Sequence, residues 1–465
     1  LTGTLTVSAN GDVKILPSGR MQAATDLSVQ GGRDIVNEGT VTAGGALALN
    51  APGTVSNAGA MSSAGNASVV ARQLDNRGAF TAGLQADGSI SPLGALSVQV
   101  NSLQNAGTLM AGGNATVTVD ALGLSGGKLV AGGALTLDAN GAITNRAGSV
   151  YGGSVLLRAS SLDNTGGKLT SGGALTVNVA GAVDNTAGTL AGAGAVAITG
   201  HSIVNAASGV VSGDSVALRG TAGINNQGGS IQANGALRVE TAGAVNNQGG
   251  KLLGGTADIQ AASLDNRNGV AQADGKLTVA NTGALQNQGG GLYGGSIDVK
   301  AASLSNTDGK VVSGRALDVN TTGNLDNTGG TVAAQGQATL NAQTLSNTRG
   351  IVAAANLTLK TQGLLDNRAG LIQADNLLAL TAGSLNNRAT LANGTPGASA
   401  TTTAQAGATP TSTSALGVMG KQVTVNANAI DNQSGRIGAG QDLGVATSTL
   451  DNTSGNVSSD ANAKL

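Results

Sequence analysis

Asparagine returns about every 20 residues along this chain, usually as the last residue of a Leu/Val-x-Asn triplet. Successive spacings are 19, 20 or 21 residues, with exceptions of 29 and 45, and Ser125 is assigned to the one slot where the asparagine is missing. A fixed short period of this kind predicts a solenoid. The recurring asparagines are Asn37, Asn57, Asn76, Asn105, Asn145, Asn164, Asn185, Asn205, Asn226, Asn247, Asn266, Asn287, Asn306, Asn327, Asn347, Asn367, Asn387, Asn432 and Asn452.

The composition agrees with a repeat scaffold better than with globular domains. A chain of 465 residues would ordinarily suggest two or three domains, but a solenoid grows in one dimension through contacts between neighbouring repeats. The 76 glycines raise disorder as an alternative. Disordered chains lack hydrophobic residues, whereas here these reach 40% and are regularly spaced, so we exclude disorder.

Charge and residue usage exclude several classes of partner. The net charge is −1 and the Lys and Arg residues are scattered singly, so the sequence predicts neither nucleic-acid binding nor an anionic membrane partner. No run of 18 apolar residues predicts a transmembrane segment. The absence of cysteine excludes disulfides and thiol chemistry. Because residue 1 is Leu and no signal peptide follows, we interpret the chain as a piece of a longer protein.

Each repeat has the pattern of three short strands. In the segment 133–150, Leu135 and Leu137 lie two residues apart around a polar Thr136, which is the period of a strand with one buried face. Ile143 and Val150 supply further inward positions after glycine-containing corners. No segment keeps the apolar spacing of a helix. The sequence therefore predicts an all-β parallel β-solenoid with about 20 residues per coil and roughly 21 coils.

A second level of order lies above the single coil. From Asn247 to Asn327 the spacings alternate as 19, 21, 19 and 21. The short coils contain Ala-Ser-Leu, as at 262–264, and the long ones contain Thr-x-Gly-x-Leu/Val, as at 241–245. The extra residues fall at corners, where they leave the inward face of each strand unchanged. We predict that the duplicated unit is a pair of coils.

The recurring asparagine is interpreted as a structural ladder. Its side chain carries both an amide donor and a carbonyl acceptor, so each copy is able to bond to the copies one coil above and one below. A buried amide needs such partners. We assign this role above all to the run from Asn145 to Asn387, and keep a row of metal or glycan ligands as the alternative.

Two insertions interrupt the repeat and define the predicted organisation. Residues 1–388 form a repeat array with a small insertion near 83–92, residues 389–420 form a low-complexity loop rich in Ala, Thr, Ser, Gly and Pro, and residues 421–465 continue the array. Insertions in repeat proteins often mark a binding face. The alternative is a tolerated surface loop, because long loops cost little closure entropy.

The residues needed for catalysis are scarce. His201 is the only histidine, so this chain by itself predicts no His-based triad and no multi-histidine metal site. Carbohydrate-cleaving β-helices gather acidic residues and aromatic platforms, but the only aromatic residues are Phe80, Tyr151 and Tyr293. Phe80 is predicted to lie in the core, and the two tyrosines to be isolated on the surface. We assign no catalytic, cofactor-binding or metal residue, no cofactor and no enzymatic activity.

Aspartates often stand directly before the recurring asparagine. On adjacent coils such carboxylates have the chemistry to bind Ca²⁺. An arginine frequently follows two residues after the aspartate, which favours simple charge balance. The aspartates are Asp75, Asp163, Asp184, Asp265, Asp326, Asp366, Asp431 and Asp451.

The repeats resemble those of filamentous haemagglutinin. The strings L-D-N-T-G-G-K-L-T-S-G-G-A-L-T-V (162–177), L-D-N-T-G-G-T-V-A-A-Q-G (325–336) and L-D-N-R-A-G-L-I-Q-A-D (365–375) carry the resemblance, which covers nearly the whole chain. Such repeats build the exoproteins of Gram-negative two-partner secretion systems, including haemagglutinin adhesins and the CdiA toxins of contact-dependent growth inhibition. The resemblance implies a right-handed parallel β-helix, export through an outer-membrane partner transporter, and a filament on the cell surface.

The resemblance leaves the role of the parent protein open. The chain has neither the Asn-Pro-Asn motif of the amino-terminal secretion domain nor the Val-Glu-Asn-Asn boundary that precedes a toxin domain, so no family site residues are carried over. The first hypothesis is a shaft that projects a receptor-binding or toxin region. The second is an adhesin that meets a receptor, a glycan or protein on a host or neighbouring cell, through a face of the rod or the 389–420 loop. A carbohydrate-active enzyme is the third and least supported.

Overall fold

Both parts of the chain fold as stacked coils of β-strand. The computed structural model describes residues 3–391 and 416–465, and every regular element in these ranges is a strand. By its contacts the chain falls into two units: unit 1 is Leu1–Asn225 with Gly229–Asn234, and unit 2 is Asn226–Gly228 with Gly235–Leu465. Each unit is a parallel β-solenoid, and the turns number about 22 in all, roughly 20 residues apart, which confirms the predicted fold class.

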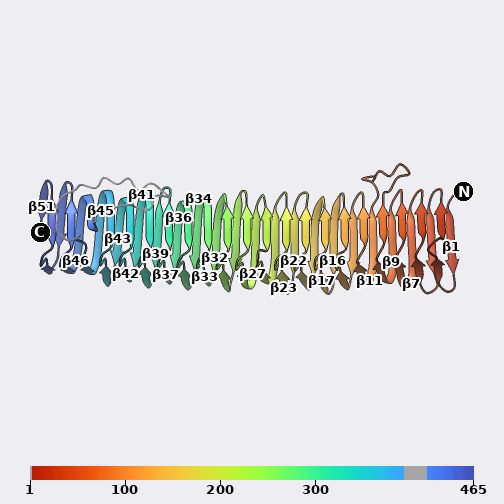
Figure 1. Cartoon of the computed structure of the whole chain (residues 1–465), viewed down its shortest axis with the longest axis horizontal. Coiled ribbons are helices and arrows are strands. Elements are labelled where there is room, and N and C mark those ends of the chain that lie inside the picture. The colour runs from red at the N-terminus through yellow and green to blue at the C-terminus, as the bar shows by residue number, and fades with distance from the viewer. Residues whose placement is uncertain (1–2, 392–415) are drawn as a thin grey trace. The chain divides into compact units, whose positions relative to one another are not determined.

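The strands of unit 1 are short and follow one another around each coil (Figure 1). They are β1 (Leu5–Ala9), β2 (Val13–Ile15), β3 (Arg20–Ala23), β4 (Leu27–Gly31), β5 (Ile35–Asn37), β6 (Thr40–Ala43), β7 (Leu47–Asn57), β8 (Ala60–Ser63), β9 (Ala67–Asn76), β10 (Ala79–Ala82), β11 (Leu96–Asn105), β12 (Thr108–Ala111), β13 (Ala115–Val119), β14 (Ala121–Gly123), β15 (Lys128–Ala131), β16 (Ala134–Ala139), β17 (Ala142–Thr144), β18 (Ser149–Gly152), β19 (Ser154–Ala159), β20 (Ser161–Asp163), β21 (Lys168–Ser171), β22 (Leu175–Val179), β23 (Ala182–Asp184), β24 (Thr189–Gly192), β25 (Val196–Val204), β26 (Val210–Gly213), β27 (Val216–Asn225) and β28 (Ser230–Ala233).

The strands of unit 2 repeat the same order, and several run continuously around a corner. They are β29 (Ala236–Thr241), β30 (Ala244–Asn246), β31 (Lys251–Gly254), β32 (Thr256–Ala261), β33 (Ser263–Asp265), β34 (Val270–Asn281), β35 (Ala284–Gln286), β36 (Gly291–Ala301), β37 (Ser303–Ser305), β38 (Lys310–Ser313), β39 (Leu317–Thr321), β40 (Asn324–Asp326), β41 (Thr331–Ala342), β42 (Thr344–Ser346), β43 (Ile351–Thr361), β44 (Leu364–Asp366), β45 (Leu371–Asn386), β46 (Gly417–Asp431), β47 (Arg436–Ala439), β48 (Asp442–Ala446), β49 (Thr449–Asp451), β50 (Asn456–Ser459) and β51 (Asn462–Lys464).

One coil shows how the repeat builds a core. Strands β16, β17 and β18 turn Leu135, Leu137, Ile143 and Val150 inward, and each of these side chains is 1% exposed. The intervening residues point outward, as the two-residue period of a strand requires. The four inward positions predicted for this coil are therefore confirmed.

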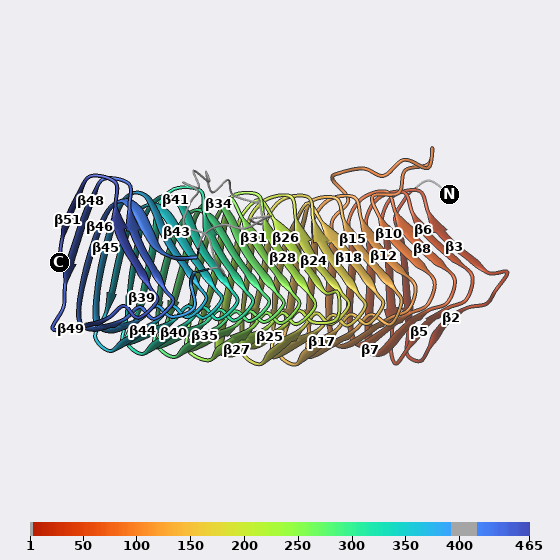
Figure 2. The ribbon, with the colours of Figure 1, turned by 60° about the vertical axis from the view of Figure 1, so that its left-hand side comes forward.

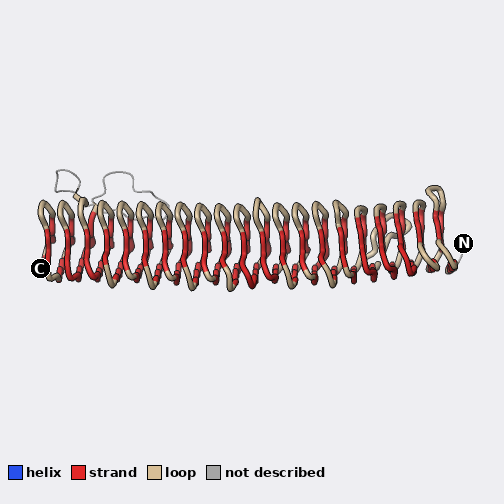
Figure 3. The backbone as a smooth tube through the Cα atoms, turned by 90° about the horizontal axis from the view of Figure 1, so that it is seen from below, coloured by secondary structure: helices blue, strands red, loops and turns tan. Residues whose placement is uncertain are grey.

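Coils pair with their neighbours in sequence through parallel strands. Leu135 lies opposite Val155 and Leu137 opposite Leu157 in the next coil, so apolar side chains stack in columns. Within each unit, Figures 2 and 3 show successive coils side by side, each joined to the next through a corner. A buried apolar side chain contributes about 1.5–3 kcal/mol, whereas ordering each residue costs about 1–2 kcal/mol of backbone entropy. One coil alone therefore does not compensate its ordering cost, and stability depends on the shared core.

The predicted pairing of coils is visible in unit 2 at one buried corner position. Ala261 lies opposite Asn281 on the next coil, and Ala301 lies opposite Thr321. Alanine thus alternates with a larger polar residue from coil to coil. The side-chain amide of Asn281 is buried, and neither of its polar atoms has a hydrogen-bond partner. The other members of this column are Thr241, Ala342, Thr361 and Ala382.

Two kinds of corner follow the asparagine. In the coils of Asn37 to Asn105, two residues separate the asparagine from the next strand, and neither has a positive φ. In the later coils the corner is longer, and its second residue is left-handed, with φ between 49° and 73°. These left-handed residues are Gly126, Ala147, Gly166, Ala187, Ala207, Gly228, Gly249, Asn268, Gly289, Asp308, Gly329, Arg349, Ala369, Ala389, Ser434 and Ser454.

The two insertions leave the stacking intact. The first forms a small hairpin between β10 and β11, closed by an antiparallel bridge between Leu84 and Ile90. The second was predicted at 389–420, of which residues 392–415 lie outside the described residues. Strand β46 begins at Gly417, so residues 417–420 belong to the strand rather than to the loop. Strands β45 and β46 pair directly, with Asn386 opposite Asp431.

Candidate functional site

The asparagines form side-chain ladders inside the solenoid. Each described Nδ2 donates to the Oδ1 of the asparagine on the next coil at 2.6–2.8 Å, and the side chains from Asn37 to Asn432 are at most 1% exposed. Nδ2 also donates to backbone carbonyls, as from Asn145 to Lys168 O at 3.1 Å. The donor–acceptor pairs are Asn37–Asn57, Asn57–Asn76, Asn76–Asn105, Asn145–Asn164, Asn164–Asn185 and Asn185–Asn205 in unit 1, and Asn226–Asn247, Asn247–Asn266, Asn266–Asn287, Asn287–Asn306, Asn306–Asn327, Asn327–Asn347, Asn347–Asn367, Asn367–Asn387, Asn387–Asn432 and Asn432–Asn452 in unit 2.

The ladder of unit 1 is interrupted at Leu124, which corrects the assignment of that slot to Ser125. Gln104 pairs with Gly123, and Gly123 pairs with Thr144, so the residue between Asn105 and Asn145 in the stack is Leu124. Leu124 is 0% exposed, whereas Ser125 points to solvent. The interruption leaves Asn145 Oδ1 buried without a donor. An orphaned buried acceptor of this kind costs about 1–3 kcal/mol.

The aspartates that precede the ladder are paired with nearby donors. Arg77, Arg267 and Arg368 form ion pairs with the aspartate two residues earlier, at 2.9, 2.6 and 2.6 Å, which confirms the predicted charge balance. Arg146 instead reaches Asp163 on the next coil at 2.5 Å. No group of three or more His, Cys, Asp or Glu residues suited to a metal ion occurs among the described residues.

The electrostatics of these aspartates follow from their partners. Burial tends to raise the pKa of Asp265, but hydrogen bonds from Arg267 and Gln248 outweigh it, so the pKa lies below its usual range. At Asp451 the hydrogen bond from the Gln433 amide, with two from Thr453, lowers the pKa to about 2. These carboxylates are therefore ionised at neutral pH and already engaged. A carboxylate in this state is poorly suited to act as a general acid.

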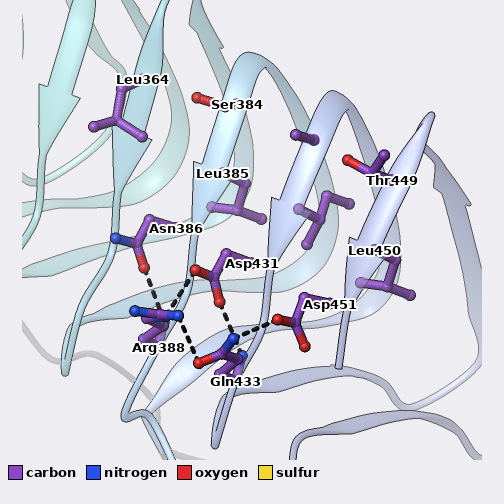
Figure 4. Close-up of a pocket in the computed structure, with 12 residues that line it drawn as sticks. Leu364, Ser384, Leu385, Asn386, Arg388, Asp431, Gln433, Thr449, Leu450 and Asp451 are labelled. Atoms are coloured by element: carbon purple, nitrogen blue, oxygen red, sulfur yellow. Dashed lines mark hydrogen bonds and ion pairs between the residues drawn. The ribbon is translucent and has the colours of Figure 1, made fainter. Parts of the chain in front are cut away.

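A shallow groove in unit 2 is the clearest concave surface among the described residues (Figure 4). Arg388 bonds to Asp431 at 2.7 Å and to Gln433 Oε1 at 2.5 Å, and Gln433 Nε2 donates to Asp451. Leu450 belongs to the last coil of the chain and lines the groove at 37% exposure. The charged groups satisfy one another across three coils, so the groove offers a structural clasp rather than a catalytic centre. The remaining lining residues are Leu364, Ser384, Leu385, Asn386, Ala429, Ile430 and Thr449.

The hairpin of unit 1 places apolar side chains in solvent. Ile90 is 41% exposed and Leu93 is 85% exposed, although the backbone around them is hydrogen-bonded. Phe80, on the strand before the hairpin, is 0% exposed and lies in the core as predicted. Tyr151 is 40% exposed.

Sequence reasoning missed three of these features. Leu124 was detectable, because Leu-Ser-Gly-Gly at 124–127 aligns with Asn-Thr-Gly-Gly at 164–167. The contacts of Gln433 and the exposure of Leu93 carry no comparable sequence signal. Gln433 acts across coils, and Leu93 lies in an insertion that has no counterpart in the repeat.

These observations define a parallel β-solenoid scaffold whose interior is organised by asparagine ladders. The family profile of the haemagglutinin repeat matches residues 1–88, 94–147, 150–222, 202–289, 252–329, 294–369, 333–394 and 420–465. The chain therefore belongs to the haemagglutinin-repeat family. No curated protein and no solved structure matches it.

Membership of this family carries a general expectation about role and place. The haemagglutinin repeat is a structural and adhesin repeat rather than an enzyme family, and its members are typically secreted or surface-exposed. Within the described residues, no helix has the length and apolar character needed to cross a membrane.

Proposed function

We propose that this chain is a shaft segment of a large exported surface protein of a Gram-negative bacterium, and that it holds a receptor-binding or toxin region away from the producing cell. The observation that carries the proposal is the uniformity of the coils. Their interiors are filled by apolar columns and asparagine ladders, and their conspicuous outward charges are paired with one another. Such coils add length without adding chemistry.

The secretion route and the partners belong to the same proposal. The resemblance to two-partner secretion exoproteins supports export through an outer-membrane partner transporter and retention at the outer membrane. Adhesion and contact-dependent growth inhibition are the two activities that a projected region of this kind serves. Its partner is then a receptor on a host or neighbouring cell. We propose no enzymatic activity for the shaft.

A deletion of two coils tests the shaft function. Removing residues 248–287 joins Asn247 to Gln288-Gly289-Gly290, the same tripeptide that follows Asn247 in the intact chain. Each coil contributes one inter-strand step of about 4.8 Å, so the deletion is expected to shorten purified unit 2 by about 10 Å. Small-angle scattering or electron microscopy measures the change, and circular dichroism checks that the β-structure is retained.

The functional form of this test uses the parent protein on cells. Attachment or toxin delivery should fall as coils are removed and recover when a copy of residues 288–327 replaces 248–287, because length rather than local sequence matters. Loss of attachment in this length-preserving replacement would contradict the shaft proposal, since it would show that a specific coil surface is required.

A second candidate function is adhesion through the insertion that follows β45. The favouring observation is that the scaffold closes beneath it: Asn387 Nδ2 reaches Asn432 Oδ1 at 2.8 Å, and Leu391 N donates to Ser434 O at 2.9 Å. Deleting residues 392–415 is therefore expected to leave the stacking intact. Unchanged adherence of cells carrying the deletion would rule out the loop as the adhesive element.

A further inference from the structure

A stripe of apolar side chains crosses one outer sheet of unit 1. Met110, Val130 and Tyr151 occupy the same outward position on β12, β15 and β18, with Met110 opposite Val130 and Val130 opposite Tyr151. The corresponding residues on the flanking strands β10 and β21 are Thr81 and Thr170. The stripe is thus bounded by polar residues along the stack.

The hairpin between β10 and β11 extends this stripe. Gly112 directly follows β12, and Ile90 Cγ2 lies 2.6 Å from the position that a Cβ on Gly112 would occupy. Ile90 therefore packs on the bare backbone at the end of the strand that carries Met110. Leu93 projects from the same hairpin and is 85% exposed.

The hairpin is fixed to the scaffold by several hydrogen bonds. Gln85 N donates to Ser89 O at 2.8 Å, and Ser91 N donates to Gly83 O at 2.7 Å. Gln85 Nε2 reaches back to Ala64 O at 2.8 Å. Ile90 and Leu93 are consequently held in solvent by an ordered backbone, and a partner would lose little entropy on meeting them.

The charges around the stripe have one sign. Lys128 and Lys168 are exposed, outward-facing residues two coils apart, with Ser149 between them and Tyr151 on the same strand as Ser149. Neither lysine forms an ion pair with any described residue. Strands β10, β12, β15, β18, β21 and β24 contain no Asp or Glu. In the hairpin, Asp87 accepts bonds from the Ser89 hydroxyl and N–H.

We propose that this surface, formed by Ile90, Leu93, Met110, Val130 and Tyr151 with Lys128 and Lys168, docks a segment of a partner protein that carries apolar side chains flanked by carboxylates. Clustered exposed apolar residues mark interaction sites, and an aromatic residue near the centre is typical of interface hot spots. Two unpaired lysines beside the stripe complement carboxylates on the partner. The proposal stands independently of the shaft function.

A protein segment fits this surface better than a lipid surface does. The apolar residues form a narrow line bordered by threonines and lysines, and the hairpin rises at one end of it. Binding to a membrane interface depends on a broad apolar face and on several basic residues together. The dimensions and polarity of the stripe match one face of an extended or helical segment.

Peptide binding tests the proposal. The probes are two fluorescein-labelled peptides with leucines at helical i, i+3, i+4 and i+7 positions, one with glutamates and one with lysines at the remaining positions. Fluorescence anisotropy with the purified full chain should show saturable, salt-sensitive binding of the glutamate peptide only. The variant Ile90→Ser/Leu93→Ser should weaken this binding about tenfold. Lys128→Glu/Lys168→Glu should abolish it and allow the lysine peptide to bind.

Matched controls separate the stripe from general stickiness and charge. Leu16→Ser removes another exposed leucine, 64% exposed, and Lys251→Glu/Lys310→Glu reverses two lysines on other coils. Both control proteins should bind the glutamate peptide like the unaltered chain, and circular dichroism should show the same fold for all variants. The charge-reversal pair keeps the test valid even if the hairpin variant is misfolded.

Other outcomes would overturn the proposal. Absence of saturable binding of the glutamate peptide would do so, as would equal weakening by the control variants. Co-sedimentation with phosphatidylserine vesicles that requires Leu93 and both stripe lysines would identify a lipid surface instead. Self-association in sedimentation equilibrium that Leu93→Ser abolishes would identify a second copy of this chain as the occupant.

Discussion

The corners that follow the ladder differ between the early coils, from Asn37 to Asn105, and the later coils, from Leu124 onward. In the early coils the corner bonds to the preceding coil: Ala58 N and Gly59 N both donate to Asn37 O, at 2.8 and 3.2 Å. In the later coils the corner closes on itself: Gly148 N donates to Asn145 O at 3.3 Å. The left-handed third residue of this four-residue turn, Ala147 with φ 51°, is the feature that a type II turn requires.

The comparison teaches that the asparagine ladder does not determine the corner beside it. Asn76 and Asn266 make the same side-chain bonds to the next coil, at 2.7 Å, although their corners differ in length and in backbone bonding. The change of corner occurs at Leu124, where the ladder of unit 1 is also interrupted. Ladder and corner are thus separate devices, and they can be perturbed separately.

Removing one asparagine from an unbroken ladder should have the largest effect. Asn266→Ala deprives Asn247 Nδ2 of its side-chain acceptor and leaves Asn287 Oδ1 without its donor. With each orphaned group costing about 1–3 kcal/mol, we expect a loss of roughly 2–5 kcal/mol in local stability. Hydrogen exchange of the coils between Asn247 and Asn287 measures it.

The natural end of a ladder run supplies the control for this experiment. Asn105 lacks a ladder partner on its C-terminal side, so Asn105→Ala orphans only Asn76 Nδ2. We expect a smaller increase in exchange around Asn105 than around Asn266. Equal effects at the two sites would show that pairing on both sides contributes little.

Filling the interruption should sharpen the same point. Leu124→Ala removes a buried side chain, and the expected loss is about 2–5 kcal/mol. Leu124→Asn loses the same apolar contacts, but it supplies a donor for Asn145 Oδ1 and an acceptor for Asn105 Nδ2. It should therefore retain about 1–3 kcal/mol more stability than Leu124→Ala in chemical unfolding. If alanine is tolerated as well as asparagine at this position, the orphaned acceptor is not costly.

The left-handed corner residue predicts a smaller effect of opposite sign. Ala369 has φ 51°, a conformation that costs a residue with a Cβ roughly 1 kcal/mol, so Ala369→Gly should stabilise the chain by up to about that amount. Ala58 occupies an early corner without a positive φ, and Ala58→Gly should be neutral or destabilising. Thermal unfolding of both variants provides the measurement. Stabilisation of both would refute the distinction between the corners.

Acid should weaken one early coil and one late coil by the same mechanism. A hydrogen bond from Arg33 lowers the pKa of Asp12 to about 2, and one from Gln433 does the same for Asp451. Because these pKa values are depressed in the folded state, the stabilisation is present above 3.8, the ordinary pKa of an aspartate, and is lost as the pH falls towards about 2.

The measurement is the thermal midpoint between pH 5 and pH 2. We expect the decline of the midpoint to be shallower in Asp12→Asn and Asp451→Asn than in the unaltered chain. Asp26→Asn removes an exposed aspartate elsewhere in unit 1 and serves as the comparison. Identical pH profiles for all four proteins would show that these contacts do not contribute to stability.

The fold was largely predictable because the repeat states it many times over. The inward positions Leu135 and Leu137 follow from strand period, and the ladder follows from the spacing of asparagine. The error at Ser125 arose because counting 20 residues from Asn105 ignores the change of corner at that coil. Register there depends on both neighbouring coils, and only the pairing of Gly123 with Thr144 settles it.

The surfaces were less predictable than the core. Pairs within one coil, such as Asp265 with Arg267, were visible in the sequence, whereas Arg146 with Asp163 depends on which residues face each other across coils. The stripe that includes Ile90 and Tyr151 joins an insertion to a strand about 60 residues later, a relation that periodicity does not contain.

The ladders also have a direction. Every described rung donates from the amino-terminal coil to the carboxy-terminal one, so the amide dipoles of each run align head to tail and each bond polarises the next. One end of a run is an unpaired carbonyl oxygen, as at Asn37, and the other end presents N–H groups. If coils assemble in the order in which the chain emerges, each finished coil offers the next a donor already aligned by those behind it. Leu124 ends one such run, and alignment begins again at Asn145.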